Sequence, residues 1–218
     1  MSQNNSLLHT RMITPRLLTE RESHISLPIA PVAGLHPLLL DANHEPLLQR
    51  FFEANPDYFQ RVHGEPVRPD EARRELDDLP PAGWSYSTRY LIGYQHAQGE
   101  LVAFVSVITD LLAVGVWHIA LFMVDSHQHG GGLASSLHQA LQTWAQQQGA
   151  RWLRLGVVVG NSRAEHFLAR QGYVVVRQRE GLTMGQLVHT VMVCLKPLNG
   201  NTQADYLAQV PRDRPDPL

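Results

Sequence analysis

A run of glycines stands where an apolar strand gives way to an amphipathic helix, and this stretch is the one best suited to chemistry. The run is His129-Gly130-Gly131-Gly132-Leu133-Ala134, between the apolar residues 119–124 and a helically spaced apolar pattern. The first N–H groups of a helix lack internal partners and carry a partial positive charge, and glycine lets a ligand approach the main chain. The turn therefore predicts a site for phosphate oxygens. A flexible connection without a ligand is the alternative interpretation.

The turn differs from two common phosphate-binding loops. No Gly-Lys-Ser or Gly-Lys-Thr follows it, so it is not a Walker loop. The G-x-G-x-x-G spacing of a dinucleotide-binding fold is absent, and no acidic residue ends the next strand. The glycines alone therefore leave the phosphate ligand open.

A second motif follows one buried strand later. It reads Asn161-x-x-Ala164-x-x-Phe167-Leu168, continuing to Gly172-Tyr173. The two motifs together resemble the GCN5-related N-acetyltransferases, whose signatures are Arg/Gln-x-x-Gly-x-Gly/Ala and Asn-x-x-Ala-x-x-Phe-Tyr-x-x-x-Gly-Phe. The turn matches at Gly132 and Ala134, and His129 replaces the usual arginine or glutamine. The resemblance covers about residues 90–196.

The resemblance implies acetyl-CoA as cosubstrate. Its pyrophosphate would lie on the amides of residues 130–135, and its pantetheine arm would pair with the strand that precedes the turn. In the family this strand and its neighbour separate at a bulge. The implied acetyl-CoA-binding residues are Met123, Val124, His129, Gly130, Gly131, Gly132, Leu133, Ala134, Ser135 and Asn161.

Two catalytic positions depart from the family pattern. The frequent tyrosine, which protonates the leaving thiolate, falls at Leu168. The glutamate that serves as base in many members of the family falls near His118. An imidazole, with an unperturbed pKa of about 6.5, suits the removal of a proton from an amine. We therefore predict His118 as the catalytic base; the alternative is that it faces solvent or packs against Trp117. Asp110 is a weaker candidate.

The elements that must position these residues alternate along the chain. Residues 90–94, 101–108 and 117–124 predict three strands, and residues 152–159 a buried fourth that follows the glycine turn and its helix. A strand is expected near residues 25–35, at a sheet edge because of Pro28 and Pro31. The pattern predicts an α/β (α+β) fold with a mixed, mostly antiparallel sheet of six to seven strands and helices on both faces. The resemblance makes it an acyl-CoA N-acyltransferase-like fold.

Composition bounds the remaining possibilities. With 218 residues, 44% of them hydrophobic, the chain suits one domain, predicted over 24–197 between tails 1–23 and 198–218. A net charge of −2 does not favour nucleic acid as a partner, and no apolar run is long enough to span a membrane.

Cys194, the single cysteine, fits a cytoplasmic location and a core position. No histidine spacing predicts a metal site, and an exposed final hairpin makes a homodimer plausible.

These observations predict an acyltransferase that moves acetyl from acetyl-CoA to a primary amine of a small molecule or peptide. The amine would attack directly in a ternary complex. Two alternatives stay open: a catalytically weak CoA-binding sensor or scaffold of the same fold, and an unrelated α/β protein whose turn binds another phosphate ligand.

Overall fold

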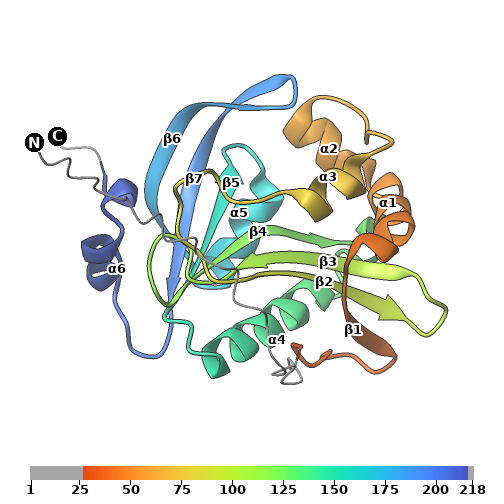
Figure 1. Ribbon diagram of the computed structural model, residues 1–218, viewed down its shortest axis with the longest axis horizontal. Coiled ribbons are helices and arrows are strands. Elements are labelled where there is room, and N and C mark those ends of the chain that lie inside the picture. Colours follow the sequence, from red (N-terminus) through yellow and green to blue (C-terminus); the bar gives the residue numbers. More distant parts are fainter. Residues whose placement is uncertain (1–26, 216–218) are drawn as a thin grey trace, which may run out of the picture.

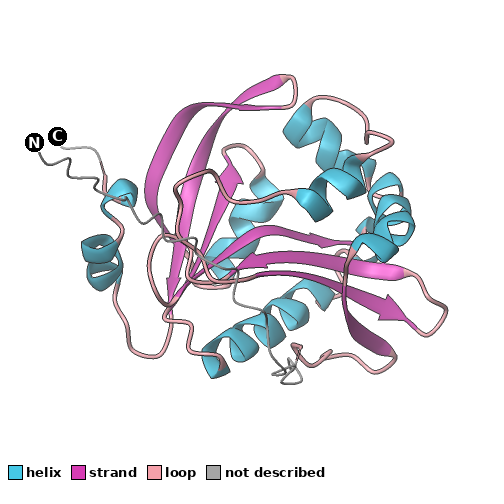
Figure 2. Cartoon of the chain, in the orientation of Figure 1, coloured by secondary structure: helices cyan, strands magenta, loops and turns pink. Residues whose placement is uncertain are grey.

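The computed structural model describes residues 27–215, which fold around one seven-stranded sheet (Figures 1 and 2). The strands are β1 (Leu35–Leu39), β2 (Arg89–His96), β3 (Leu101–Ile108), β4 (Val116–Val124), β5 (Trp152–Val158), β6 (Val174–Met184) and β7 (Leu187–Pro197). Their order is β1-β2-β3-β4-β5-β7-β6. All neighbours are antiparallel except β4 and β5, which are parallel because a helix connects them. The predicted fold class is confirmed.

Helices cover both faces of this sheet. They are α1 (Glu45–Glu53), α2 (Pro56–His63), α3 (Glu71–Asp77), α4 (Leu133–Gln147), α5 (Ser162–Arg170) and α6 (Gln203–Gln209). Short 3-10 helices are η1 (Ala42–His44), η2 (Ser126–Gln128) and η3 (Pro211–Asp213). No helix within the described residues is long and apolar enough to cross a membrane.

The alternation of strand side chains separates the helices into two layers. Trp117 and Ile119 of β4 point into the core cluster that contains the apolar faces of α4 and α5. Their neighbour Val116 points the other way and packs with Tyr206 of α6. Helices α1–α3 cover another part of that second face, where they pack on Phe104 of β3. Figure 1 shows α1–α3 and α4 on opposite sides of the central strands.

The first strand begins later than the sequence predicts. No strand forms over residues 27–34, and β1 runs over Leu35–Leu39. It does lie at the sheet edge, as expected for a strand interrupted by proline, and Pro37 stands in its middle. The predicted interval was wrong because Pro28 and Pro31 withhold two backbone donors, whereas a single proline is tolerated on an edge strand.

The C-terminal segment is more ordered than its polar sequence predicts. Residues 198–218 were expected to form a tail, but α6 and η3 pack onto the sheet. Tyr206 and Asp213 are both 0% exposed. The predicted N-terminal tail, residues 1–23, lies outside the described residues.

Candidate active site

The central strands β4 and β5 separate part-way along their length. They pair only over Val116–Ile119 and Trp152–Leu155. Beyond these residues β5 continues beside β7, and β4 continues beside β3. The two strands therefore form a V in the middle of the sheet, with its vertex at Ile119 and Leu155.

A bulge in β4 marks this vertex. Ser106 of β3 pairs with Leu121, whereas Val107 pairs with Ile119, so Ala120 is the extra residue. Ala120 is exposed although it lies on a central strand, and Leu121 beside it is only half-buried. The bulge thus leaves residues of a central strand accessible at the vertex.

Backbone direction decides which groups of β4 face the opening. Asp125 donates its N–H to the Val102 carbonyl oxygen of β3 at 2.9 Å. Successive residues of a strand direct their backbone groups to opposite sides, so those of Val124 and Phe122 face away from β3. Met123 faces β3, and its side chain is buried against α1–α3. Of the predicted pair Met123 and Val124, this geometry favours Val124. Sequence reasoning missed Phe122 because register cannot be read from one strand.

The glycine turn lies at the open end of β4. Asp125 caps η2, and the chain then passes through Gly130 and Gly132 at φ of 87° and 83°. L side chains rarely adopt this conformation, and a Cβ at either position would meet nothing within 4 Å. No side chain caps the 15-residue helix α4 at Gly132. The first N–H groups of α4, among them those of Leu133, Ala134 and Ser135, thus suit an anion in open space.

His129 connects this turn to α5. Its Nε2 lies 2.9 Å from the Val124 carbonyl oxygen, and its Nδ1 contacts Nη1 of Arg163. Because a guanidinium only donates, Nδ1 is the acceptor in this contact, and Nε2–H donates to the Val124 carbonyl. Arg163 therefore brings a cation to the turn from another element. Sequence reasoning missed it, since Arg163 occupies an unspecified position of the second motif.

Asn161 stands on the opposite side of the V, at the end of β5. Its side-chain oxygen caps α5 by accepting from the N–H of Ala164 at 3.5 Å, as its position predicts. Its own N–H donates to the Val158 carbonyl at 3.1 Å. This capped turn holds α5, and with it Arg163, beside the glycine turn.

His118 lies at the vertex, on the face of the sheet that α6 covers. Its Nδ1 is 3.1 Å from the Arg154 carbonyl oxygen and 3.2 Å from Arg154 Nη1. Burial, and then the charge of Arg154, lower the pKa of His118 to about 3. The ring is therefore neutral near pH 7 but accepts a proton only weakly.

A buried ion network from the C-terminal segment holds Arg154. Its Nε donates to Asp213 Oδ2 at 2.7 Å and lies 3.1 Å from the Tyr206 hydroxyl. Arg179 of β6 donates to Asp213 Oδ1 at 2.8 Å. Burial alone would raise the pKa of Asp213, yet Arg154, Tyr206 and Arg179 hold it well below its usual range. Residues far apart in sequence thus build the second face of the vertex.

Two further sequence predictions concern core positions. Leu168, which stands at the family's tyrosine position, is 7% exposed and packs in the cluster of α4 and α5. Cys194 is buried in the same cluster, and burial raises the pKa of its thiol to about 11. No group of three or more His, Cys, Asp or Glu residues within 27–215 is arranged to hold a metal ion.

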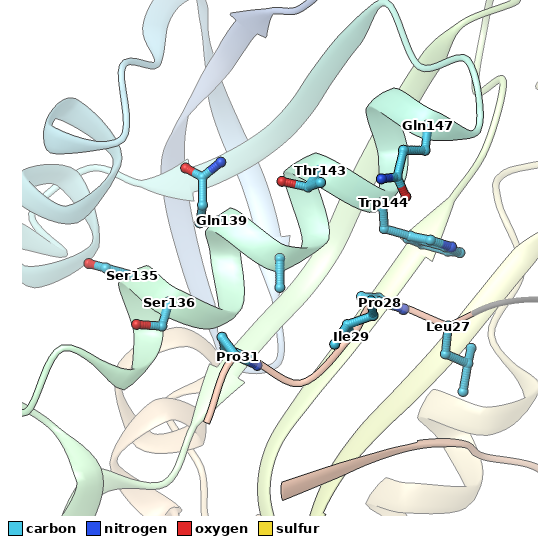
Figure 3. Close-up of a pocket in the computed structure, with 11 residues that line it drawn as sticks. Leu27, Pro28, Ile29, Pro31, Ser135, Ser136, Gln139, Thr143, Trp144 and Gln147 are labelled. Carbon is cyan, nitrogen blue, oxygen red and sulfur yellow. The ribbon is translucent and has the colours of Figure 1, made fainter. Parts of the chain in front are cut away.

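A separate hollow of about 550 Å³ lies on the outer side of α4 (Figure 3). It is lined by Leu27, Pro28, Ile29 and Pro31 on one side and by polar and apolar residues of α4 on the other. It includes Ser135 and Ser136, but no residue of β4 or β5. The candidate site is therefore the V of the sheet and not this hollow.

Comparison with known protein families identifies the family of this chain. A family model described as the acetyltransferase (GNAT) family matches residues 48–173. The chain belongs to the GNAT acetyltransferase family. This match confirms the resemblance and the enzyme class predicted from the two motifs. The family uses acetyl-CoA. No curated protein matches this GNAT acetyltransferase significantly.

Solved structures share the fold of this GNAT acetyltransferase at low identity. An acetyltransferase from Thermus thermophilus is 24% identical with a TM-score of 0.60, covering 77% of this chain and 99% of its own. A spermidine N-acetyltransferase from Vibrio cholerae, in complex with CoA and spermine, is 15% identical with a TM-score of 0.58, covering 81% and 99%. A Salmonella typhimurium acetyl transferase that modifies the N-terminal serine of a ribosomal protein is 17% identical with a TM-score of 0.62, covering 78% and 98%.

Proposed function

We propose that this GNAT acetyltransferase binds acetyl-CoA in the V between β4 and β5 and transfers the acetyl group to a primary amine. The observation that carries the proposal is the parting of β4 from β5 at the bulge, with the glycine turn at the open end of β4. One end of the opening suits phosphates, and the other exposes a central strand in the middle of the sheet.

Each part of acetyl-CoA is matched by a different group of residues along the V. The amides of residues 130–135 receive the pyrophosphate, and Arg163 adds a cation beside it. The backbone of Val124 and Phe122 pairs with the pantetheine arm. An N–H group of the same strand polarises the thioester carbonyl, and such a donor stabilises the charge that develops on the oxygen.

The acceptor is proposed to be a primary amine of a small molecule or a peptide, which attacks directly in a ternary complex. The fold neighbours include a spermidine N-acetyltransferase and an enzyme acting on an N-terminal serine, and they support testing both kinds of amine. Leu168 offers no proton to the departing sulfur, but a thiolate is a fair leaving group near neutral pH. The role of His118 as base is kept as one assignment to be tested.

A catalytically weak CoA-binding sensor or scaffold is the second candidate. Leu168 at the tyrosine position and the low pKa of His118 favour it, because a leucine side chain carries no proton to transfer and His118 accepts one only weakly near pH 7. The two candidates agree on CoA binding and differ in turnover.

Calorimetric titration with acetyl-CoA is the first test, and we expect saturable binding. Absence of binding at high micromolar ligand would overturn both candidates. A panel containing spermidine, amino alcohols, amino acids and short peptides with free N-termini is then assayed by release of free thiol. Turnover with one class of amine supports the enzyme, whereas binding without turnover across the panel supports the sensor.

A further inference from the structure

A buried asparagine lies at the corner between α1 and α2. Asn55 is 5% exposed and precedes Pro56, which begins α2. An asparagine at this position usually caps its helix through the side-chain oxygen, as Asn161 does for α5. Asn55 makes no such bond to α2. Its amide must therefore find a donor and an acceptor elsewhere, because an unpaired polar group is costly to bury.

This amide binds the backbone in two different parts of the chain. Asn55 Nδ2 donates to the carbonyl oxygen of Phe51, in the last turn of α1, at 2.8 Å. Asn55 Oδ1 accepts the N–H of Ser126, 71 residues away, also at 2.8 Å. Ser126 begins η2, the short helix between β4 and the glycine turn. The α1–α2 corner therefore holds the chain that leads from β4 into the turn (Figure 1).

Ser126 connects this contact to the glycine turn. Its carbonyl oxygen accepts the N–H of His129 at 3.2 Å, so two hydrogen bonds join Asn55 to the first residue of the turn. The glycines that follow have more backbone freedom than any other residue type. The place of the turn therefore depends on how firmly its first residue is held.

Two side chains hold this approach to the turn from opposite faces of the sheet. Arg163 reaches His129 from α5, on the face that α4 covers, in an exposed contact. Asn55 reaches Ser126 from the corner of α1 and α2, which pack on the other face, and its amide is buried. A hydrogen bond shielded from water is stronger than an exposed one. Asn55 is thus the firmer of the two restraints.

We propose that Asn55 is a positioning residue of the donor site: through Ser126 it fixes the place of the turn that receives the pyrophosphate. This inference rests on the proposed function and deepens it, because it gives the layer of α1–α3 a part in the binding of acetyl-CoA. Asn55 acts through the backbone of Ser126 and does not itself contact the ligand.

The first test compares Asn55→Ala with Gln49→Ala. Gln49 is another amide of the same layer, but it binds the backbone at the start of α3: its Nε2 donates to the Arg68 carbonyl at 2.8 Å, and its Oε1 accepts from the Ala72 N–H at 3.0 Å. Both variants lower the thermal midpoint. Asn55→Ala weakens CoA binding about tenfold, as expected for one lost hydrogen bond to a charged group, and Gln49→Ala leaves it within about twofold.

Pantetheine, which lacks the phosphates, separates a displaced turn from a loosened fold. Calorimetric titrations are run below the unfolding temperature of every variant, and the affinity of Asn55→Ala for pantetheine stays at the wild-type value. Wild-type affinity of Asn55→Ala for CoA, or equal losses for CoA and pantetheine, overturns the assignment while the proposed function stands. Absence of CoA binding by the wild type overturns the proposed function itself.

Ser126→Pro breaks the same hydrogen bond from the other side and serves as the test if Asn55→Ala does not fold. Proline lacks the N–H and suits the first position of a helix after an extended residue such as Asp125, whose φ is −46° and ψ 128°. It weakens CoA binding to the same extent as Asn55→Ala and adds nothing to that variant, since both changes remove one contact. Additive losses would show that the two residues act independently and would overturn the proposal.

Discussion

The two ends of the V are built in opposite ways. The proposed donor end consists of backbone N–H groups from one continuous stretch, residues 129–135, with Arg163 added from α5. The vertex gathers side chains from β4, β5, β6, α6 and η3, including His118, Arg154 and Asp213. The turn proposed to bind phosphates is a local property of the chain, whereas the side-chain network at the vertex depends on packing between distant segments.

This difference explains why the two ends should respond differently to substitution. Changes at the turn should weaken acetyl-CoA binding without loosening the fold, because the turn is exposed and few side chains rest on it. Changes at the vertex should affect stability or turnover while leaving acetyl-CoA affinity nearly intact. Each prediction below tests that separation.

The largest effect is expected from Asp213→Asn in the C-terminal segment. Asp213 is fully buried against Arg154 and Arg179, and removing one partner of a buried ion pair costs about 3–5 kcal/mol. The thermal midpoint should fall on the order of 10 °C. Thermal and urea unfolding measure the loss.

Asp205→Asn is the matched control, since Asp205 is an exposed capping residue of α6 in the same segment. It should lower stability far less. A fall of the acetyl-CoA affinity in Asp213→Asn below the unfolding temperature would contradict the separation of the two ends.

Gly132→Val should weaken acetyl-CoA binding by about 100-fold. A β-branched residue at φ of 83° strains the start of α4 and turns its N–H groups away from the anion. Calorimetric titration measures the dissociation constant. Gly131→Ala is the control, because Gly131 has no positive φ and an added Cβ would meet only the Gln128 carbonyl at an ordinary 3.7 Å. Equal affinities for the two variants would show that the phosphates lie elsewhere.

Arg163→Gln should weaken CoA binding by about fivefold at low salt, since an exposed ion pair contributes up to about 1 kcal/mol and is screened by salt. Binding of pantetheine, which lacks the phosphates, should not change. Arg170→Gln removes a charge from the other end of the same helix and serves as the control. A loss that is equally large for pantetheine would place Arg163 outside the phosphate site.

His118→Asn is expected to have the smallest effect, less than about threefold on kcat/KM. With a pKa of about 3, His118 is neutral at every pH above 5, so its removal should leave the acidic limb in place. The pH profile of the variant measures this. Loss of the acidic limb would instead assign the base to His118, as its residue type alone predicts.

Sequence patterns predicted most elements because those elements are strongly periodic. Residues 101–108 form β3 as predicted, and the helix after the glycine turn runs over Leu133–Gln147. The early strand and the C-terminal segment were misjudged for a common reason: their stability comes from distant partners. The edge strand β1 depends on β2, and α6 depends on Trp152 and Arg154, about 50 residues away in sequence.

The sequence by itself determined the family and led to the proposed donor end, because the glycine-based and asparagine-based motifs consist of groups that are close along the chain. It also placed Asn161 as a helix cap from its position alone. Only the tertiary structure decided which backbone groups of β4 face the opening and that Arg163 reaches His129. The same holds for Asp213, which reaches Arg154 at the vertex from the C-terminal segment. These facts depend on strand register and on packing between layers, and neither is encoded in the spacing of any one segment.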